Sequence, residues 1–479
     1  MTMTPHTIRS RRTAGRFRSA LTMTTAGLML LSGCAVSSEA ASQDGTAADG
    51  ATATPASISV TDDGASDGDA ATTGVDLFDS GVVHAISVDF DQADYDAMIE
   101  TFTSTGDKEW ISATLTIDGV TYENVGLRLK GNSSLFGLTA ATSGNPEDLP
   151  WLIRLNEFVE GADHQGYEEI VIRSNSTETA LNEAVAQELL ALTGLAWQRP
   201  IATAFTVNGG ETELRLAVEH PDEEWYEDNF DDEDGLLYKA DSEGDYSYRG
   251  DDAEAYTDVF DQKVGDDDMQ PLIDFLDFIN NADDATFAAE LTDWLDVDAF
   301  ATYLAFQDLI GNADDINGRG NNSYLQYDTT TNQFTVVSWD LNLAFGTANV
   351  GRTADAAGSA GAEPGGRAGG GGAGAGRPAG PPPGAPGDAP AGGPDGMPAG
   401  GPGDQPNVLV DRFLAEEEFA SLYVSKTAEL TELLYSSGTV DLVTANWTDV
   451  LINGASDLVS VATVTADAAA IIGYVDGVR

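Results

Sequence analysis

A long run of glycine, proline and alanine interrupts the part of this chain that can bury a core. Residues 351–406 include Pro381, Pro382 and Pro383, repeated Gly-Gly steps and almost no large apolar side chain. Such a segment cannot bury enough surface to offset its conformational entropy, so we expect a disordered insertion. Amphipathic helical patterns resume at Asn407. We therefore predict one domain built from residues 77–350 and completed by a helical part, residues 407–479.

The amino-terminal end has the pattern of an export signal. Five arginines and no acidic residue lie among the first 33 residues, and a short apolar stretch ends in Leu31-Ser-Gly-Cys34. That stretch is too short to span a bilayer stably but suits a signal peptide. The sequence around Cys34 resembles a bacterial lipobox, in which the cysteine is lipidated. We predict a signal peptide over residues 1–33, a lipid anchor on Cys34 at the outer face of the cytoplasmic membrane, and a disordered tether over residues 34–76.

The chain is strongly acidic, and its charge excludes some functions. Its 80 acidic residues outnumber 22 basic ones, which gives a net charge of -58. A surface of this kind repels nucleic acid, so we expect no DNA or RNA partner. Cys34 is the single cysteine of the sequence, so an intrachain disulfide is impossible.

Two kinds of periodicity divide the predicted domain. Strand-like alternation on either side of the turn Asp118-Gly119 predicts a β-hairpin, and residues 203–218 repeat the pattern around Asn208-Gly209. Helical spacing follows over residues 269–280, 284–295 and 297–310. Antiparallel hairpins followed by a mainly helical part indicate the α+β class.

The segment from Asn312 to Gly346 contains the most chemically informative pattern. A predicted helix delivers the chain to a polar loop, a strand leaves that loop at Asn322, and the return strand ends at Asp340. The hairpin should bring Asn322 and Asp340 to the same end. Protein kinases use the same order: a loop aspartate, then an asparagine, then an aspartate after a hairpin. The spacing departs from the ordinary kinase loop, so a structural polar loop remains the alternative on spacing alone.

Three groups of residues resemble the CotH kinase family. They are Asn312-Ala-Asp314, Asn322-Ser-Tyr-Leu-Gln-Tyr327 and Trp339-Asp-Leu-Asn-Leu-Ala-Phe-Gly346. Upstream, Arg128-Leu-Lys130-Gly-Asn-Ser133 is similar to a further element of that family. The resemblance implies an atypical protein-kinase-like fold, ATP with Mg²⁺ or Mn²⁺ as cofactors, and Ser/Thr of proteins outside the cytoplasm as substrates.

The resemblance also assigns roles in phosphoryl transfer. Asp314 would be the catalytic base, with Asp315 as the alternative, because the double aspartate leaves the choice open. Asn322 and Asp340 would hold the metal ion through oxygen atoms, the ligands that Mg²⁺ prefers.

A kinase also needs a cation on the nucleotide phosphates. Lys130 is our first candidate, and Arg128 and Lys239 are rivals because basic residues are scarce in this chain. A helix glutamate should orient that cation, and we expect it to be Glu188 rather than Glu183.

Two functions remain open at this point. One is an extracytoplasmic protein kinase; the other is a non-catalytic cell-surface adhesin or assembly protein with a kinase-like fold. The presence of Asp314, Asn322 and Asp340 together favours catalysis, because a protein that had lost catalysis would be expected to lack one of them.

Overall fold

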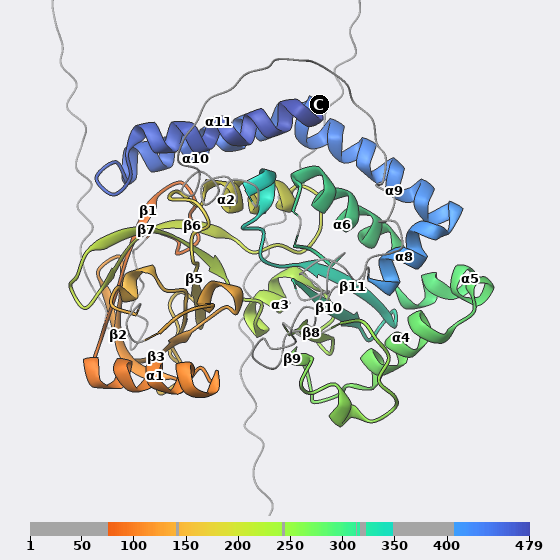
Figure 1. Cartoon of the computed structure of the whole chain (residues 1–479), viewed down its shortest axis with the longest axis horizontal. Coiled ribbons are helices and arrows are strands. Elements are labelled where there is room, and N and C mark those ends of the chain that lie inside the picture. The colour runs from red at the N-terminus through yellow and green to blue at the C-terminus, as the bar shows by residue number, and fades with distance from the viewer. Residues whose placement is uncertain (1–74, 140–142, 242–244, 313, 317–321, 348–406) are drawn as a thin grey trace, which may run out of the picture. The chain divides into compact units, whose positions relative to one another are not determined.

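The computed structural model describes residues 75–139, 143–241, 245–312, 314–316, 322–347 and 407–479. The predicted signal peptide, Cys34 with its predicted lipid anchor, almost all of the tether and the 351–406 insertion lie outside these residues. The described part of the chain mixes helices with two β-sheets (Figure 1), so the predicted α+β class is confirmed.

Seven strands form a closed barrel in the order β1-β2-β3-β4-β5-β7-β6. The neighbours β1 and β6 pair in parallel and close the ring, while the other pairs are antiparallel. The strands are β1 (Val83–Phe90), β2 (Ile111–Ile117), β3 (Val120–Leu129), β4 (Trp151–Arg154), β5 (Glu169–Ile172), β6 (Pro200–Val207) and β7 (Thr212–Glu219).

Both predicted hairpins belong to this barrel. Asp118 and Gly119 have φ values of 47° and 87°, as a two-residue turn between β2 and β3 requires. Alternate side chains of β2 point inward, so Leu115 and Ile117 are fully buried in the barrel core. The helix α1 (Gln92–Thr105) adds Tyr95 and Met98 to the same core.

A second, four-stranded sheet has the order β11-β10-β8-β9. Its strands are β8 (Leu236–Ala240), β9 (Phe260–Val264), β10 (Ser323–Asp328) and β11 (Gln333–Ser338). The hairpin of β10 and β11 was predicted from the sequence. Asp328 Oδ1 accepts hydrogen bonds from the backbone of Thr330 and Thr331, which fixes the turn that reverses the chain.

The predicted helices over residues 269–310 are present and lie close to their expected bounds. They are α4 (Gln270–Asn281), α5 (Asp284–Trp294) and α6 (Val297–Ile310). Asp283 and Asp296 cap α5 and α6 by accepting from backbone N–H groups. Two further helices are α2 (Leu181–Ala191), between β5 and β6, and α3 (Glu223–Asn229), between β7 and β8.

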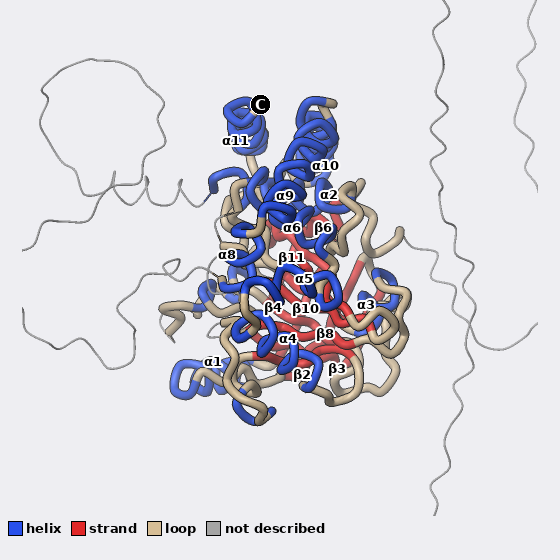
Figure 2. Tube along the Cα trace, turned by 90° about the vertical axis from the view of Figure 1, so that its right-hand side faces the viewer, coloured by secondary structure: helices blue, strands red, loops and turns tan. Residues whose placement is uncertain are grey.

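The carboxy-terminal residues form α8 (Val408–Ala415), α9 (Glu417–Leu430), α10 (Thr439–Gly454) and α11 (Val461–Val478). Helix α9 packs against α6, and α10 and α11 pack against α2; Figure 2 shows these helices on one side of the strands. Phe413 joins the apolar cluster of α4–α6, and Leu451 joins that of α2. Residues before and after the Gly/Pro-rich segment therefore share common cores.

One helix of the described residues, α11, is long and apolar enough to cross a membrane by length and composition. Val464, Ile471 and Val475 on its inner side are buried against the rest of the protein.

Candidate functional site

The β10–β11 hairpin brings the predicted metal ligands to one end. Ser323 pairs with Ser338, so Asn322 and Trp339 lie at the same end of the hairpin, next to Asp340. Asp340 has a φ of 60°, a left-handed conformation that aspartate tolerates better than most residues. The carbonyl of Asn342 holds the following turn, because it accepts hydrogen bonds from Asn182 Nδ2 at 2.6 Å and Ser176 Oγ at 2.7 Å.

Asp314 lies beside this pair. Asn322 Nδ2 donates to the Asp314 carbonyl oxygen at 2.9 Å. Burial raises the pKa of the Asp314 carboxyl and the charge of Asp340 raises it further, whereas Asn322 and Lys239 act in the opposite direction. Two carboxylates next to an amide oxygen make a donor set that fits Mg²⁺ or Mn²⁺.

Asp314 and Asp315, the first candidate for the base and its alternative, have different surroundings in the structure. Asp315 is 5% exposed, and its charge contributes to the raised pKa of the buried Tyr303 phenol. Tyr303 also accepts a hydrogen bond from the backbone N–H of Ile316 at 3.2 Å. Asp314 is therefore the aspartate that lies beside Asn322 and Asp340.

An arginine that the sequence analysis missed connects the site to helix α2. Arg173 follows β5, and its guanidinium pairs with Asp340 through Nη2 and with Glu183 Oε1 through Nε at 2.8 Å. Burial raises the pKa of Glu183 to about 7; the Arg173 charge opposes this rise and the Asp340 charge adds to it. The sequence did contain a signal for Arg173. It is a basic residue at the end of a strand, followed by a helix that carries a glutamate on its inner side.

This pairing corrects the expected role of Glu188. Its carboxylate accepts from Ser80 Oγ at 2.9 Å, on the other side of α2 from the hairpin. One turn and a half earlier on the helix, Glu183 is 2% exposed and faces the site. The helix glutamate beside the site is thus Glu183, and its cation is Arg173 rather than a lysine.

The three predicted cations occupy different places. Lys130 Nζ lies 5.1 Å from the centre of the Trp339 ring, and Lys239 Nζ lies 5.3 Å from that of Tyr324. Arg128 lies instead over Trp110, at 4.8 Å. Two of the three cations therefore contact aromatic rings at the Asn322–Asp340 end of the hairpin region. Arg128 contacts a different ring, although its charge is close enough to lower the pKa of Lys130.

Burial affects the charge of both lysines at the site. It lowers the pKa of Lys239 to about 8, although the nearby charges of Asp241 and Asp340 raise it. It also holds the pKa of Lys130 well below its ordinary value, because that ammonium is enclosed between protein groups. Each lysine would gain stabilisation of its charged form from a phosphate group bound next to it.

The turn after Lys130 needs a glycine. Gly131 has a φ of 101°, and a Cβ atom there would clash with Ser134 Oγ. The chain then enters a single 3-10 turn, Ser133–Leu135. Lys130 is therefore placed at the end of a strand by a close turn that a side chain at position 131 would disrupt.

A half-buried carboxyl near this site should make stability depend on pH. Asp222 caps α3 through Trp225 N at 2.9 Å, and burial raises its pKa from 3.8 to about 8. The native protein then binds more protons than the unfolded chain between these values, so stability falls as pH rises through this window. We expect the melting temperature to fall from pH 5 to pH 8, and Asp222→Asn to reduce that fall.

The exposed cap Asp283 provides a control for this experiment. It accepts from Thr286 N at 2.9 Å, as Asp222 does from Trp225, but it lies in solvent and its pKa is lowered by that hydrogen bond. Asp283→Asn should leave the pH dependence between pH 5 and pH 8 unchanged. If the melting temperature falls equally with pH in Asp222→Asn and in the unmodified protein, Asp222 is ionised in the folded state.

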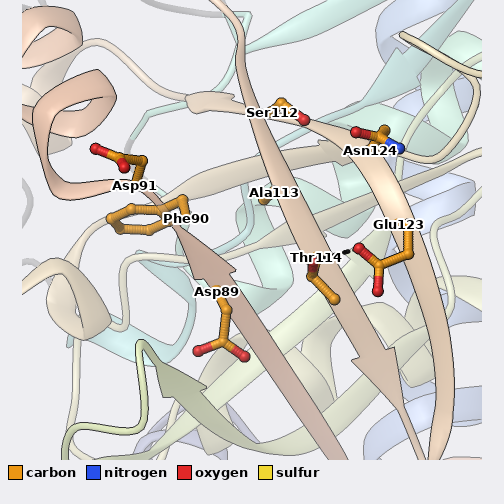
Figure 3. Close-up of a pocket in the computed structure, with 8 residues that line it drawn as sticks. All are labelled: Asp89, Phe90, Asp91, Ser112, Ala113, Thr114, Glu123 and Asn124. Carbon is orange, nitrogen blue, oxygen red and sulfur yellow. Dashed lines mark hydrogen bonds between the residues drawn. The ribbon is translucent and has the colours of Figure 1, made fainter.

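An open acidic groove lies elsewhere, on the outer wall of the barrel (Figure 3). Thr114 Oγ1 donates to Glu123 at 3.0 Å across its floor. None of the predicted site residues lines it. The lining residues are Asp89, Phe90, Asp91, Ser112, Ala113, Thr114, Glu123 and Asn124.

The geometry defines a polar centre in which two aspartates and an asparagine lie beside the buried Arg173 and the half-buried Lys130 and Lys239. Such a centre suits a metal ion bound to a phosphorylated ligand. The family model described as CotH kinase protein matches residues 127–445, which include this centre and more than half of the chain. The chain therefore belongs to the CotH kinase family. No curated protein matches the sequence.

Proposed function

We propose that this protein is an extracytoplasmic atypical protein kinase. It would transfer the γ-phosphate of ATP, with Mg²⁺ or Mn²⁺, to Ser/Thr hydroxyls of secreted or surface proteins. The observation that carries the proposal is the convergence of Asp314, Asn322 and Asp340 at one end of the β10–β11 hairpin. Membership of the CotH kinase family supports a kinase-like activity independently.

Each residue has a defined part in this reaction. Asp314 accepts the proton of the substrate hydroxyl, whose oxygen forms a bond to the γ-phosphorus as the bond to the bridging oxygen of ADP breaks. Asn322 and Asp340 are the residues that would hold the metal ion. A bound Mg²⁺ or Mn²⁺ supplies neutralisation of the phosphate charge. Lys130 and Lys239 add cationic groups from the β3 and β8 sides.

We also propose that the fold is kinase-like in its plan. The barrel supplies Lys130 and Arg173, and the second sheet supplies Lys239, Asn322 and Asp340. Helix α2 contributes Glu183 at the junction of the two sheets. A nucleotide held between a β-rich part and a mainly helical part is the arrangement that protein kinases use.

Transfer of labelled phosphate from ATP to the purified protein or an added protein substrate tests the proposed activity. We expect metal-dependent incorporation, and a loss on the order of 10²-fold or more in Asp314→Asn, because a general base is removed. Asp315→Asn is the matched control and should keep most of the activity if it folds. A folded protein that neither binds nucleotide nor incorporates phosphate would instead be a non-catalytic adhesin or assembly protein.

The membrane location is a separate proposal that rests on the sequence. Cys34 follows a basic segment and an apolar stretch and lies at the end of Leu31-Ser-Gly-Cys34. Cys34→Ser should release the protein from membranes or leave its signal peptide uncleaved. Fractionation of cells into membrane and soluble parts measures this, and a variant that stays with membranes like the unmodified protein would contradict lipidation.

A further inference from the structure

Three potential metal ligands meet next to the proposed kinase site. One oxygen of Glu169, one nitrogen of His220 and one oxygen of Asp222 all lie within 4.8 Å of one another. Glu169 begins β5, and the other two follow β7, its neighbour in the barrel. Histidine with two carboxylates is a set that holds Zn²⁺ or Mn²⁺ in many proteins, so the occupant of this cluster has to be identified.

Protein cations already lie against the cluster. Lys130 Nζ is 3.0 Å from His220 Nε2, and His220 Nδ1 is hydrogen-bonded to Glu169 Oε2. The second oxygen of Glu169 accepts from Arg154 Nε. Both ring nitrogens of His220 and both oxygens of Glu169 are therefore engaged. A divalent ion here would have to displace these bonds and would face two positive side chains at short range.

The protonation states follow from these contacts. A lysine ammonium can only donate, so His220 Nε2 accepts and His220 Nδ1–H donates to Glu169. Burial and the charge of Lys130 lower the pKa of His220 to about 4, which keeps the imidazole neutral near pH 7. Burial alone would raise the pKa of Glu169, but its hydrogen bonds to His220 and Arg154 and the charge of Arg154 hold it at about 2. The carboxylate thus fixes the tautomer that Lys130 requires.

The other side of Lys130 faces Trp339. The ammonium lies 5.1 Å from the indole centre, and the His220 ring lies edge-on to the same indole at 6.4 Å. Trp339 directly precedes Asp340 in the chain. Glu169 and His220 consequently fix the ammonium of Lys130 relative to the proposed metal ligand, while two of its three N–H donors remain for other acceptors.

We propose that Glu169 and His220 form a positioning dyad that holds Lys130 for the phosphates of the nucleotide. Two of the three residues in the cluster, Glu169 and His220, then hold a lysine ammonium and not a metal ion. This inference rests on the proposed kinase function and extends it by two residues. In this role the neutral imidazole and the fixed carboxylate together act on Lys130 as Glu183 acts on Arg173.

A double-mutant cycle with Lys130 tests the dyad. His220→Leu should weaken Mg-ATP binding roughly ten- to a hundredfold, the range expected when a charged group loses a hydrogen bond. His220→Gln retains an acceptor and should recover much of that loss. In a Lys130→Met background, His220→Leu should cause little further change, because both substitutions interrupt the same interaction. Calorimetric titration of Mg-ATP into the full-length protein measures all four states.

Another buried histidine supplies the matched control. His164 is 3% exposed and its Nδ1 is hydrogen-bonded to Tyr122 at 2.7 Å, within the barrel. His164→Gln should leave Mg-ATP binding unchanged. If the unmodified protein binds Mg-ATP but the effects of His220→Leu and Lys130→Met are additive, the dyad is wrong and the kinase proposal stands. If the unmodified protein binds no Mg-ATP at all, both proposals fail together.

A metal titration without nucleotide distinguishes the remaining possibility. Zn²⁺ or Mn²⁺ binding should be the same in the unmodified protein and in Glu169→Gln, since the carboxylate serves Arg154 and His220. Tight binding of one ion per chain that Glu169→Gln abolishes would make the cluster a metal centre and overturn the proposed dyad.

Discussion

Asp340→Asn is expected to weaken metal-dependent nucleotide binding tenfold or more and to lower turnover at least as much. The carboxylate would supply charge to the metal ion, which a neutral amide cannot replace. Its partner Arg173 retains a second carboxylate, Glu183, so the loss should fall mainly on binding rather than on folding. Titration of Mg-ATP by calorimetry, together with the melting temperature, separates the two effects.

The same hairpin provides a control at its opposite end. Asp328 caps the β10–β11 turn and is paired in register with Gln333, one strand length from Asp340. Asp328→Asn should leave Mg-ATP binding unchanged, because an asparagine can still cap that turn. If Asp340→Asn binds Mg-ATP normally, this hairpin does not hold the metal ion.

Arg173→Met should produce the largest loss of stability. Arg173 and Glu183 have side-chain exposures of 10% and 2%, so removal of the guanidinium leaves a buried carboxyl without its cation and close to Asp340. Breaking a buried ion pair from one side typically costs about 3–5 kcal/mol. Chemical unfolding in urea should measure such a loss at pH 8. It should be smaller at pH 5.5, where Glu183 binds a proton.

Two further variants check the cause of this loss. Adding Glu183→Gln to Arg173→Met should recover part of the stability, because the unpaired charge is removed. Arg249 pairs with Asp245 at 3.1 Å on the surface, and Arg249→Met should cost less than about 1 kcal/mol. Equal losses in Arg173→Met and Arg249→Met would show that the Arg173–Glu183–Asp340 ion pairs contribute little to folding.

The sequence predicted the features that depend on short-range patterns. The turn at Asp118-Gly119 identifies its hairpin because few residues adopt those φ values. The helices of residues 270–310 follow from apolar spacing and their aspartate caps. The β10–β11 hairpin brings Asn322 and Asp340 together for the same local reason, so this half of the site was accessible from the sequence.

The remainder depends on contacts between distant segments. Closure of the barrel through β1 and β6 joins Val83 to Ala202, and no local pattern indicates that parallel pairing. Arg173 reaches Asp340 across 167 positions, and His220 reaches Lys130 across 90. Glu183 and Glu188 both lie on α2, and only the packing of that helix decides which one faces the site. Such choices follow from tertiary packing and could not be made from residue order.

The location of the metal ion tests the central claim most directly. A crystal grown with Mn²⁺ and a non-hydrolysable ATP analogue would reveal the ion by anomalous scattering. We predict one Mn²⁺ within coordination distance of an Asp340 carboxylate oxygen and the Asn322 amide oxygen, with the terminal phosphate directed towards Asp314. Mn²⁺ bound by Glu169, His220 and Asp222, or nucleotide bound away from the β10–β11 hairpin, would contradict the account.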